Sequence, residues 1–158
     1  MRYILIDRIV SMEPGRSLRA FKLVSATDGF VATYGNGMPA LPASMLMEAM
    51  AQAAGLLAVR SSDTPSQPVL AKVQPFTARG LARAGDRVDL EAVLEDLRPE
   101  GCRAAVTASV DGRVIANGTV FLGFVPIADA ATEALLAHQL TVLFPGWFDE
   151  PARVETAS

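Results

Sequence analysis

The 158-residue chain has one histidine, one cysteine and an aromatic content of only 6%. A single cysteine allows no internal disulfide and is typical of a reducing compartment. The chain has no run of about 18 or more charge-free apolar residues, which predicts no membrane span. Its opening, MRYILIDRIVSMEPG, is too short and too charged for a signal peptide. We therefore expect a cytoplasmic protein.

Excess basic charge is also missing, since the formal net charge is −3. Nucleic-acid-binding domains are usually basic, so the charge argues against that class. The chain is 51% hydrophobic, which excludes an intrinsically disordered protein and provides a sizeable core for one domain. We expect no metal ion and no organic cofactor.

One stretch, residues 45–59, is almost wholly apolar and carries a single acid, Glu48. A helix that is apolar all round is normally buried, and burying an unpaired carboxylate costs several kcal/mol or more. Ser44, Glu48 and Gln52 are spaced four residues apart, so they form one stripe on a helix. A polar stripe on a buried helix indicates a lined crevice.

The start of this helix follows two prolines, Pro39 and Pro42. Ser44 would cap the helix if it began one residue later. Otherwise free backbone N–H groups near Ala43 point out of the helix end, with the positive pole of the helix dipole behind them. Such an end can hold a carbonyl oxygen or an anion.

The remaining pattern is mostly that of strands. Residues 3–10 predict a helical turn or an extended segment, residues 12–15 a turn, residues 26–41 a loop and residues 61–67 a linker. Asp111-Gly112 lies between two alternating runs and is the strongest hairpin signal. A C-terminal helix is expected at residues 127–140. Strands are expected at residues 17–25, 69–78, 86–97, 102–110 and 113–124.

These elements predict an α+β hot-dog fold, an antiparallel sheet of about five or six strands wrapped around a long central helix. We expect the hot-dog domain at residues 1–126, and a C-terminal helix and tail at residues 127–158. Because one sheet face cannot cover a helix that is apolar on every side, a second copy is expected to close it, giving a homodimer or a higher oligomer.

The sequence PALPASMLMEAMAQAAG at residues 39–55 resembles the helix motif of the β-hydroxyacyl-acyl-carrier-protein dehydratases, the FabZ/FabA hot-dog family. The opening ILIDRIV at residues 4–10, KVQPF at residues 72–76 and AGD at residues 84–86 resemble further family segments. The resemblance covers roughly residues 1–125. It implies a protein that binds acyl thioesters of acyl carrier protein or coenzyme A and dehydrates 3-hydroxyacyl groups in fatty acid or polyketide biosynthesis.

The resemblance implies that Glu48 is the catalytic acid, that Gln52 is its supporting amide and that the N–H of Ala43 holds the thioester carbonyl, beside Ser44. The family's loop histidine falls on Tyr34, because the family's His-Phe-Pro-Gly-His-Pro is Tyr-Gly-Asn-Gly-Met-Pro here. Tyrosine has a reference pKa of about 10 and is a poor base. The single histidine, His138, lies outside the resemblance and is interpreted as a surface or packing residue.

Three hypotheses stay open. The chain is a dehydratase in which Tyr34 or a water replaces the histidine, a non-catalytic partner in a heterodimer with a histidine-bearing paralogue, or a hot-dog thioesterase. In a thioesterase, Glu48 would direct water at the carbonyl. Exposed basic residues form a candidate docking rim for an acidic carrier protein: Lys72, Arg79, Arg83 and Arg87.

Overall fold

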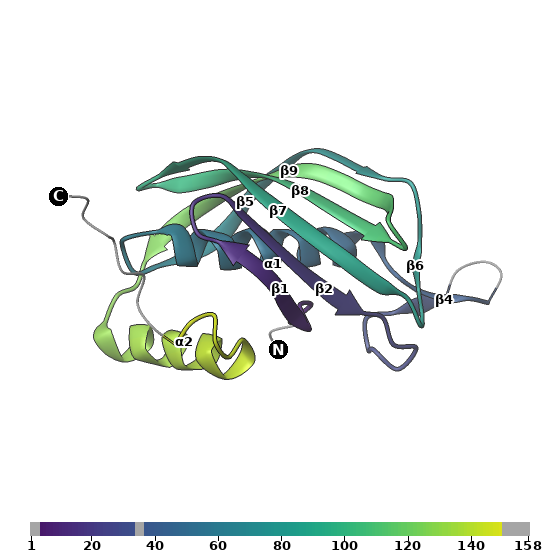
Figure 1. The fold of residues 1–158 in the computed structure, drawn as a ribbon, viewed down its shortest axis with the longest axis horizontal. Helices are drawn as coiled ribbons and strands as arrows, with labels where there is room; N and C mark the ends of the chain where they lie inside the picture. Colours follow the sequence, from purple (N-terminus) through teal and green to yellow (C-terminus); the bar gives the residue numbers. More distant parts are fainter. Residues whose placement is uncertain (1–3, 34–36, 150–158) are drawn as a thin grey trace.

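The computed structural model describes residues 4–33 and 37–149, and shows one long helix lying against a curved antiparallel sheet (Figure 1). The sheet has six strands in the order β1-β2-β7-β8-β9-β5. This is the predicted α+β hot-dog architecture. The elements are β1 (Arg8–Glu13), β2 (Ser17–Leu23), α1 (Ala43–Ser61), β5 (Ser66–Ala78), β7 (Arg87–Arg98), β8 (Gly101–Val110) and β9 (Arg113–Pro126).

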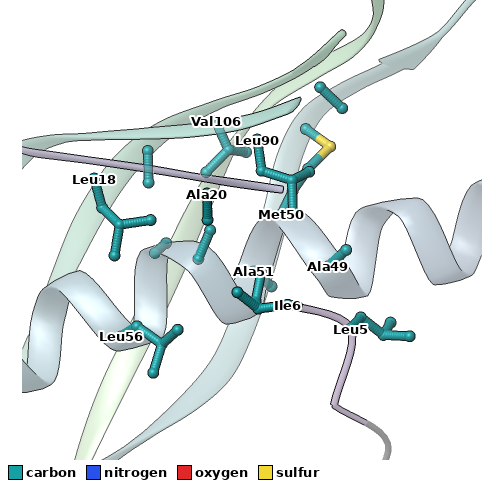
Figure 2. Packing of buried hydrophobic residues seen from close by; sticks show 14 of the residues in the cluster. Leu5, Ile6, Leu18, Ala20, Ala49, Met50, Ala51, Leu56, Leu90 and Val106 are labelled. Atoms are coloured by element: carbon teal, nitrogen blue, oxygen red, sulfur yellow. The ribbon is translucent and has the colours of Figure 1, made fainter. Parts of the chain in front are cut away.

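Small side chains let the sheet approach the helix closely. On α1, Ala49, Ala53 and Ala54 are fully buried, and on the facing strands Ala92 and Ala104 are fully buried too. Larger side chains belong to the same core, as Figure 2 shows for Leu18, Met50, Leu90 and Val106, among others. Alternation of buried and exposed residues along β2, β7 and β8 directs one face of each strand to this core.

The Asp111-Gly112 hairpin is confirmed. Val110 of β8 pairs with Arg113 of β9, which leaves a two-residue loop. Both loop residues have positive φ, 50° at Asp111 and 75° at Gly112. That pair of values is the type I′ geometry, whose twist matches the flanking strands.

The predicted loop at residues 26–41 and the predicted turn at residues 12–15 need correction, whereas the extended alternative for the opening segment is confirmed. Residues 26–41 are not only a loop, because they contain β3 (Ala32–Thr33) and β4 (Pro39–Leu41). These strands form a second, three-stranded sheet with β6 (Ala82–Arg83). No local alternation marks them, because they are only two and three residues long, and β4 also pairs with β6, some forty residues away. The opening is extended rather than helical, and β1 runs through Glu13 into the predicted turn.

The long helix, α1, is buried over most of its circumference by β2, β5, β7, β8 and β9. Half-buried residues recur along one side of α1, at Met45, Glu48, Gln52, Gly55 and Val59. The polar part of the predicted stripe is therefore on the less covered side of α1. No helix within the described residues combines the length and the apolarity needed to cross a lipid bilayer.

The C-terminal helix is present as α2 (Ala130–Leu143), shifted three residues from its predicted position. Asp129 caps its first turn by accepting from the backbone N–H of Thr132 at 2.8 Å. None of the residues of α2 is buried. The segment that follows it docks on the domain, because Phe144 is buried and Nε of Arg60, in the last turn of α1, donates to the carbonyl of Trp147 at 3.0 Å.

Candidate functional site

The N-terminal end of α1 is open. The helix begins at Ala43 with Pro42 as its N-cap, and no side chain caps it. The first intrahelical bond runs from Leu46 N–H to the Pro42 carbonyl at 3.0 Å, so the N–H groups of residues 43–45 have no acceptor within the helix. Ser44 is therefore not the cap, and both Ala43 and Ser44 are exposed. The free N–H groups and the helix pole make this end a binding position for a carbonyl oxygen or an anion.

The polar stripe continues one turn into α1 with a hydrogen-bonded pair. Nε2 of Gln52 donates to Oε1 of Glu48 at 3.0 Å. Oε1 of Gln52 accepts from the backbone N–H of Leu5 at 2.8 Å. Because the Leu5 N–H can only donate, it fixes which end of the amide faces Glu48. The structure therefore places the amide of Gln52 between Glu48 and the backbone of Leu5, and the contact with Leu5 is one that the sequence pattern does not predict.

The carboxylate of Glu48 has few partners among the described residues. Among residues 4–33 and 37–149 it forms no ion pair, and no described residue donates to its second oxygen, Oε2. Its side chain is half-buried on the less covered side of α1. A carboxylate held through one oxygen and open at the other can exchange a proton with a bound molecule.

The open helix end and the carboxylate of Glu48 lie close together on α1. Ser44 lies one turn before Glu48 on the same face, about 6 Å along the helix axis at about 1.5 Å per residue. A short acyl group with its carbonyl at the helix end can therefore reach Glu48 with its next carbons. We expected a lined crevice here, yet the two hollows seen on the single chain are lined by strand residues of the sheet and the segments joining them, and not by α1.

Of the predicted basic residues, Arg83 lies beside this site. It is exposed on β6 and pairs with Ala40 of β4, the strand that leads into α1. Arg87 instead stacks on the ring of Phe21, 4.1 Å from its centroid, and bonds to Asp89. Lys72 lies on β5 over the ring of Phe121. The four basic residues are spread over three strands and a loop.

Three other candidates are placed as follows. Tyr34 lies outside the described residues. His138 is exposed on α2, whose following segment docks at the far end of α1 from the site. Cys102 is a buried thiol on β8, and burial raises its pKa to about 11, so it stays protonated at neutral pH. The structure therefore brings together Ala43, Ser44, Glu48 and Gln52. Among the described residues, no histidine lies with them.

Comparisons with known proteins identify the same segment. Residues 1–119 match the model of the FabA-like domain. The 3-hydroxyacyl-[acyl-carrier-protein] dehydratase FabZ of Ruminiclostridium cellulolyticum is 33% identical over 119 residues, which cover 75% of this chain and 84% of that protein.

Solved structures share the fold at low identity. The dehydratase heterocomplex ApeI:P from Xenorhabdus doucetiae is similar with a TM-score of 0.64 and 17% identity, over 84% of this chain and 88% of that one. A hypothetical thioesterase with coenzyme A from Streptococcus pneumoniae is similar with a TM-score of 0.62 and 13% identity, over 77% and 88%. Helix α2 begins after the matched residues, at Ala130.

Proposed function

Since the chain belongs to the FabA-like family of 3-hydroxyacyl-acyl-carrier-protein dehydratases, we propose that it binds an acyl thioester at the N-terminal end of α1 and dehydrates it with Glu48. The observation that carries this proposal is the Gln52–Glu48 hydrogen bond, which leaves Oε2 of Glu48 open one turn from an uncapped helix end.

Substrate binding uses the free N–H groups around Ala43 and Ser44. A thioester carbonyl oxygen placed there accepts a hydrogen bond, and the helix pole stabilises the negative charge that develops on that oxygen when the C2 proton leaves. The methyl group of Ala43 points away from its own N–H, so alanine retains the donor. Binding at this end aims the C2 and C3 atoms at Glu48.

Dehydration then removes one proton from C2 and returns one to the C3 hydroxyl. The C2–H electron pair becomes the C2=C3 bond, the C3–O bond breaks, and the oxygen leaves as water with no net change in protons. Glu48 is the main proton carrier, and Tyr34 or a water molecule is the second. The carboxylate can fill either role because it is half-buried and unpaired among the described residues.

A second candidate is a partner subunit that binds the acyl chain while a histidine-bearing paralogue supplies the proton carrier. The absence of histidine from residues 34–39 favours this alternative. ApeI:P, which has a similar fold, is itself a dehydratase heterocomplex. The open edge strand β5 suits pairing with a second hot-dog chain, either the same or a paralogue, because unpaired strand edges associate readily.

Purified protein is the test, with 3-hydroxyacyl and 2-enoyl thioesters of acyl carrier protein and of coenzyme A as substrates. The dehydratase proposal expects interconversion of the two acyl forms without thiol release, and its loss in Glu48→Gln. Thiol release would establish the thioesterase instead. Turnover that appears only with a histidine-bearing paralogue would establish the partner role, and no turnover in either setting overturns the dehydratase proposal.

A further inference from the structure

A partly buried ion cluster, with a buried lysine between two more exposed carboxylates, lies between β2 and the N-terminal segment. Lys22 is the one charged side chain buried among the described residues, with 6% of its surface exposed. Its Nζ lies 3.3 Å from Oδ2 of Asp7 and 3.3 Å from Oδ2 of Asp28. It also lies 5.9 Å from the centroid of the Phe30 ring. An ammonium group withdrawn from water costs several kcal/mol unless partners compensate it, so this cluster depends on both carboxylates.

One carboxylate anchors the segment that supports the candidate site. Asp7 donates its N–H to the Phe21 carbonyl at 2.9 Å and accepts from the Leu23 N–H through Oδ2. Two residues earlier in the same segment, the fully buried Leu5 donates its N–H to Gln52. The position of that N–H therefore depends on how Asp7 is held.

The other carboxylate fixes the segment that leads to the helix start. Oδ2 of Asp28 accepts from the Ser25 N–H at 3.1 Å, and the Asp28 carbonyl accepts from the Val31 N–H at 3.0 Å. The following strand, β3, pairs with β4, which ends directly before α1. Lys22 thus joins the two segments that flank the site.

We infer that Lys22 is a positioning residue that acts through Asp7 and the Leu5 N–H to hold Gln52, and through Gln52 to orient the carboxylate of Glu48. The inference rests on the proposed function for its catalytic consequence, whereas the structural coupling stands without it. The ion pair between Arg16 and Glu13, in the same hairpin, is exposed to solvent and therefore differs from the Lys22 cluster. Arg16 and Glu13 are 74% and 60% exposed, and such pairs contribute little to stability.

Amide hydrogen exchange on the full chain tests the coupling without any need for activity. In Lys22→Met, a side chain of similar length without charge leaves Asp7 and Asp28 without their shared lysine. We expect the Leu5 amide to exchange at least tenfold faster, and the Gln52 side-chain amide resonance, assigned by its loss in Gln52→Met, to shift. Arg16→Met is the matched control and should change neither. Unchanged Leu5 exchange and Gln52 resonance in folded Lys22→Met would overturn the inference.

Kinetics then test the catalytic consequence. With an active protein, Lys22→Met should lower kcat about tenfold with little change in KM, and the Lys22→Met/Gln52→Met double variant should lose no more kcat than Gln52→Met alone. Additive losses would show that Lys22 acts elsewhere. If Lys22→Met does not fold, Asp7→Asn applies the same exchange measurement. A wild-type chain without turnover would refute the proposed function. The hydrogen-exchange result would then decide alone whether Lys22 positions Leu5 and Gln52.

Discussion

Gln52 and Glu48 lie one turn apart on α1, and the amide nitrogen of Gln52 donates to Oε1 of Glu48 across 3.0 Å. The other end of that amide is occupied by the Leu5 N–H. The glutamine therefore cannot rotate away without breaking two hydrogen bonds, and it limits the directions in which the carboxylate can point. Its expected role is orientation of Glu48 rather than proton transfer.

Replacing Gln52 separates orientation from chemistry. Gln52→Met keeps the side-chain length but removes the hydrogen bonds to Glu48 and to Leu5. Bonds to charged groups contribute about 1.5–3 kcal/mol, so we expect kcat on a 3-hydroxyacyl thioester to fall by at least about tenfold while KM changes little. Gln139→Met on the exposed surface of α2 is the control. Equal kcat in the two variants would show that Glu48 does not need this partner.

Position 34 decides what carries the second proton. Tyr34→His introduces a group whose reference pKa of about 6.5 suits proton transfer near neutrality, so we expect faster dehydration than wild type at pH 7. Tyr34→Phe should lower the rate if the phenol is the carrier and leave it unchanged if a water molecule is. Steady-state assays of the three proteins side by side measure both effects. A Tyr34→His protein no faster than wild type would argue that the site lacks more than a histidine.

Local patterns predicted much of this molecule. The hairpin at Asp111-Gly112 follows from two residues that tolerate positive φ, and α1 follows from an apolar run with a stripe at helical spacing, which correctly grouped Glu48 with Gln52. Contacts between distant segments could not be predicted in this way. The Leu5–Gln52 bond joins residues 47 positions apart, and Lys22 is an ordinary polar residue of a strand until folding places Asp7 and Asp28 around it.

Under the proposed function, Arg83 is the candidate for contact with an acidic carrier protein, because it pairs with Ala40 on the strand that leads into α1. We expect Arg83→Glu to raise KM several-fold for a carrier-protein substrate, since like charges would then oppose docking. KM for an acyl-pantetheine thioester, which has no phosphate, should stay the same. Arg103→Glu makes the same charge change on β8, where Arg103 bonds to Glu95. A similar KM increase in both variants would indicate a general charge effect in place of a docking contact.

The first turn of α2 should depend on pH through Asp129. Hydrogen bonds from Thr132 lower the pKa of this carboxyl, so the folded helix favours the ionised form. The stabilisation is present above the ordinary Asp pKa of about 3.9 and is lost as the pH falls through the lower folded value. Amides 132–134 should therefore exchange faster, relative to their intrinsic rates, below about pH 4. Asp129→Asn keeps an acceptor and should abolish this pH dependence. If the pH dependence persists in that variant, another titrating group is responsible.

Gly101 and Gly123 are register partners on β8 and β9, yet a methyl group fits only one of them. A Cβ on Gly101 would collide with the carbonyl oxygen of Leu122, whereas a Cβ on Gly123 meets nothing within 4 Å. The obstacle at Gly101 is backbone of the neighbouring strand β9, so it cannot turn aside as a side chain does. Overpacking of this kind costs about 1–3 kcal/mol.

Thermal unfolding measures the difference directly. At about 2–4 °C per kcal/mol for a chain of this size, Gly101→Ala should lower Tm by several degrees, and Gly123→Ala should leave it unchanged or raise it by up to a few degrees, because alanine restricts the unfolded chain. Alanine lowers the backbone entropy of the unfolded chain equally in both variants. The difference between the two Tm values therefore reports the steric contact alone. Equal Tm values would mean that β8 and β9 separate at this end to admit the methyl group, and the close contact between Gly101 and Leu122 would not constrain the sheet.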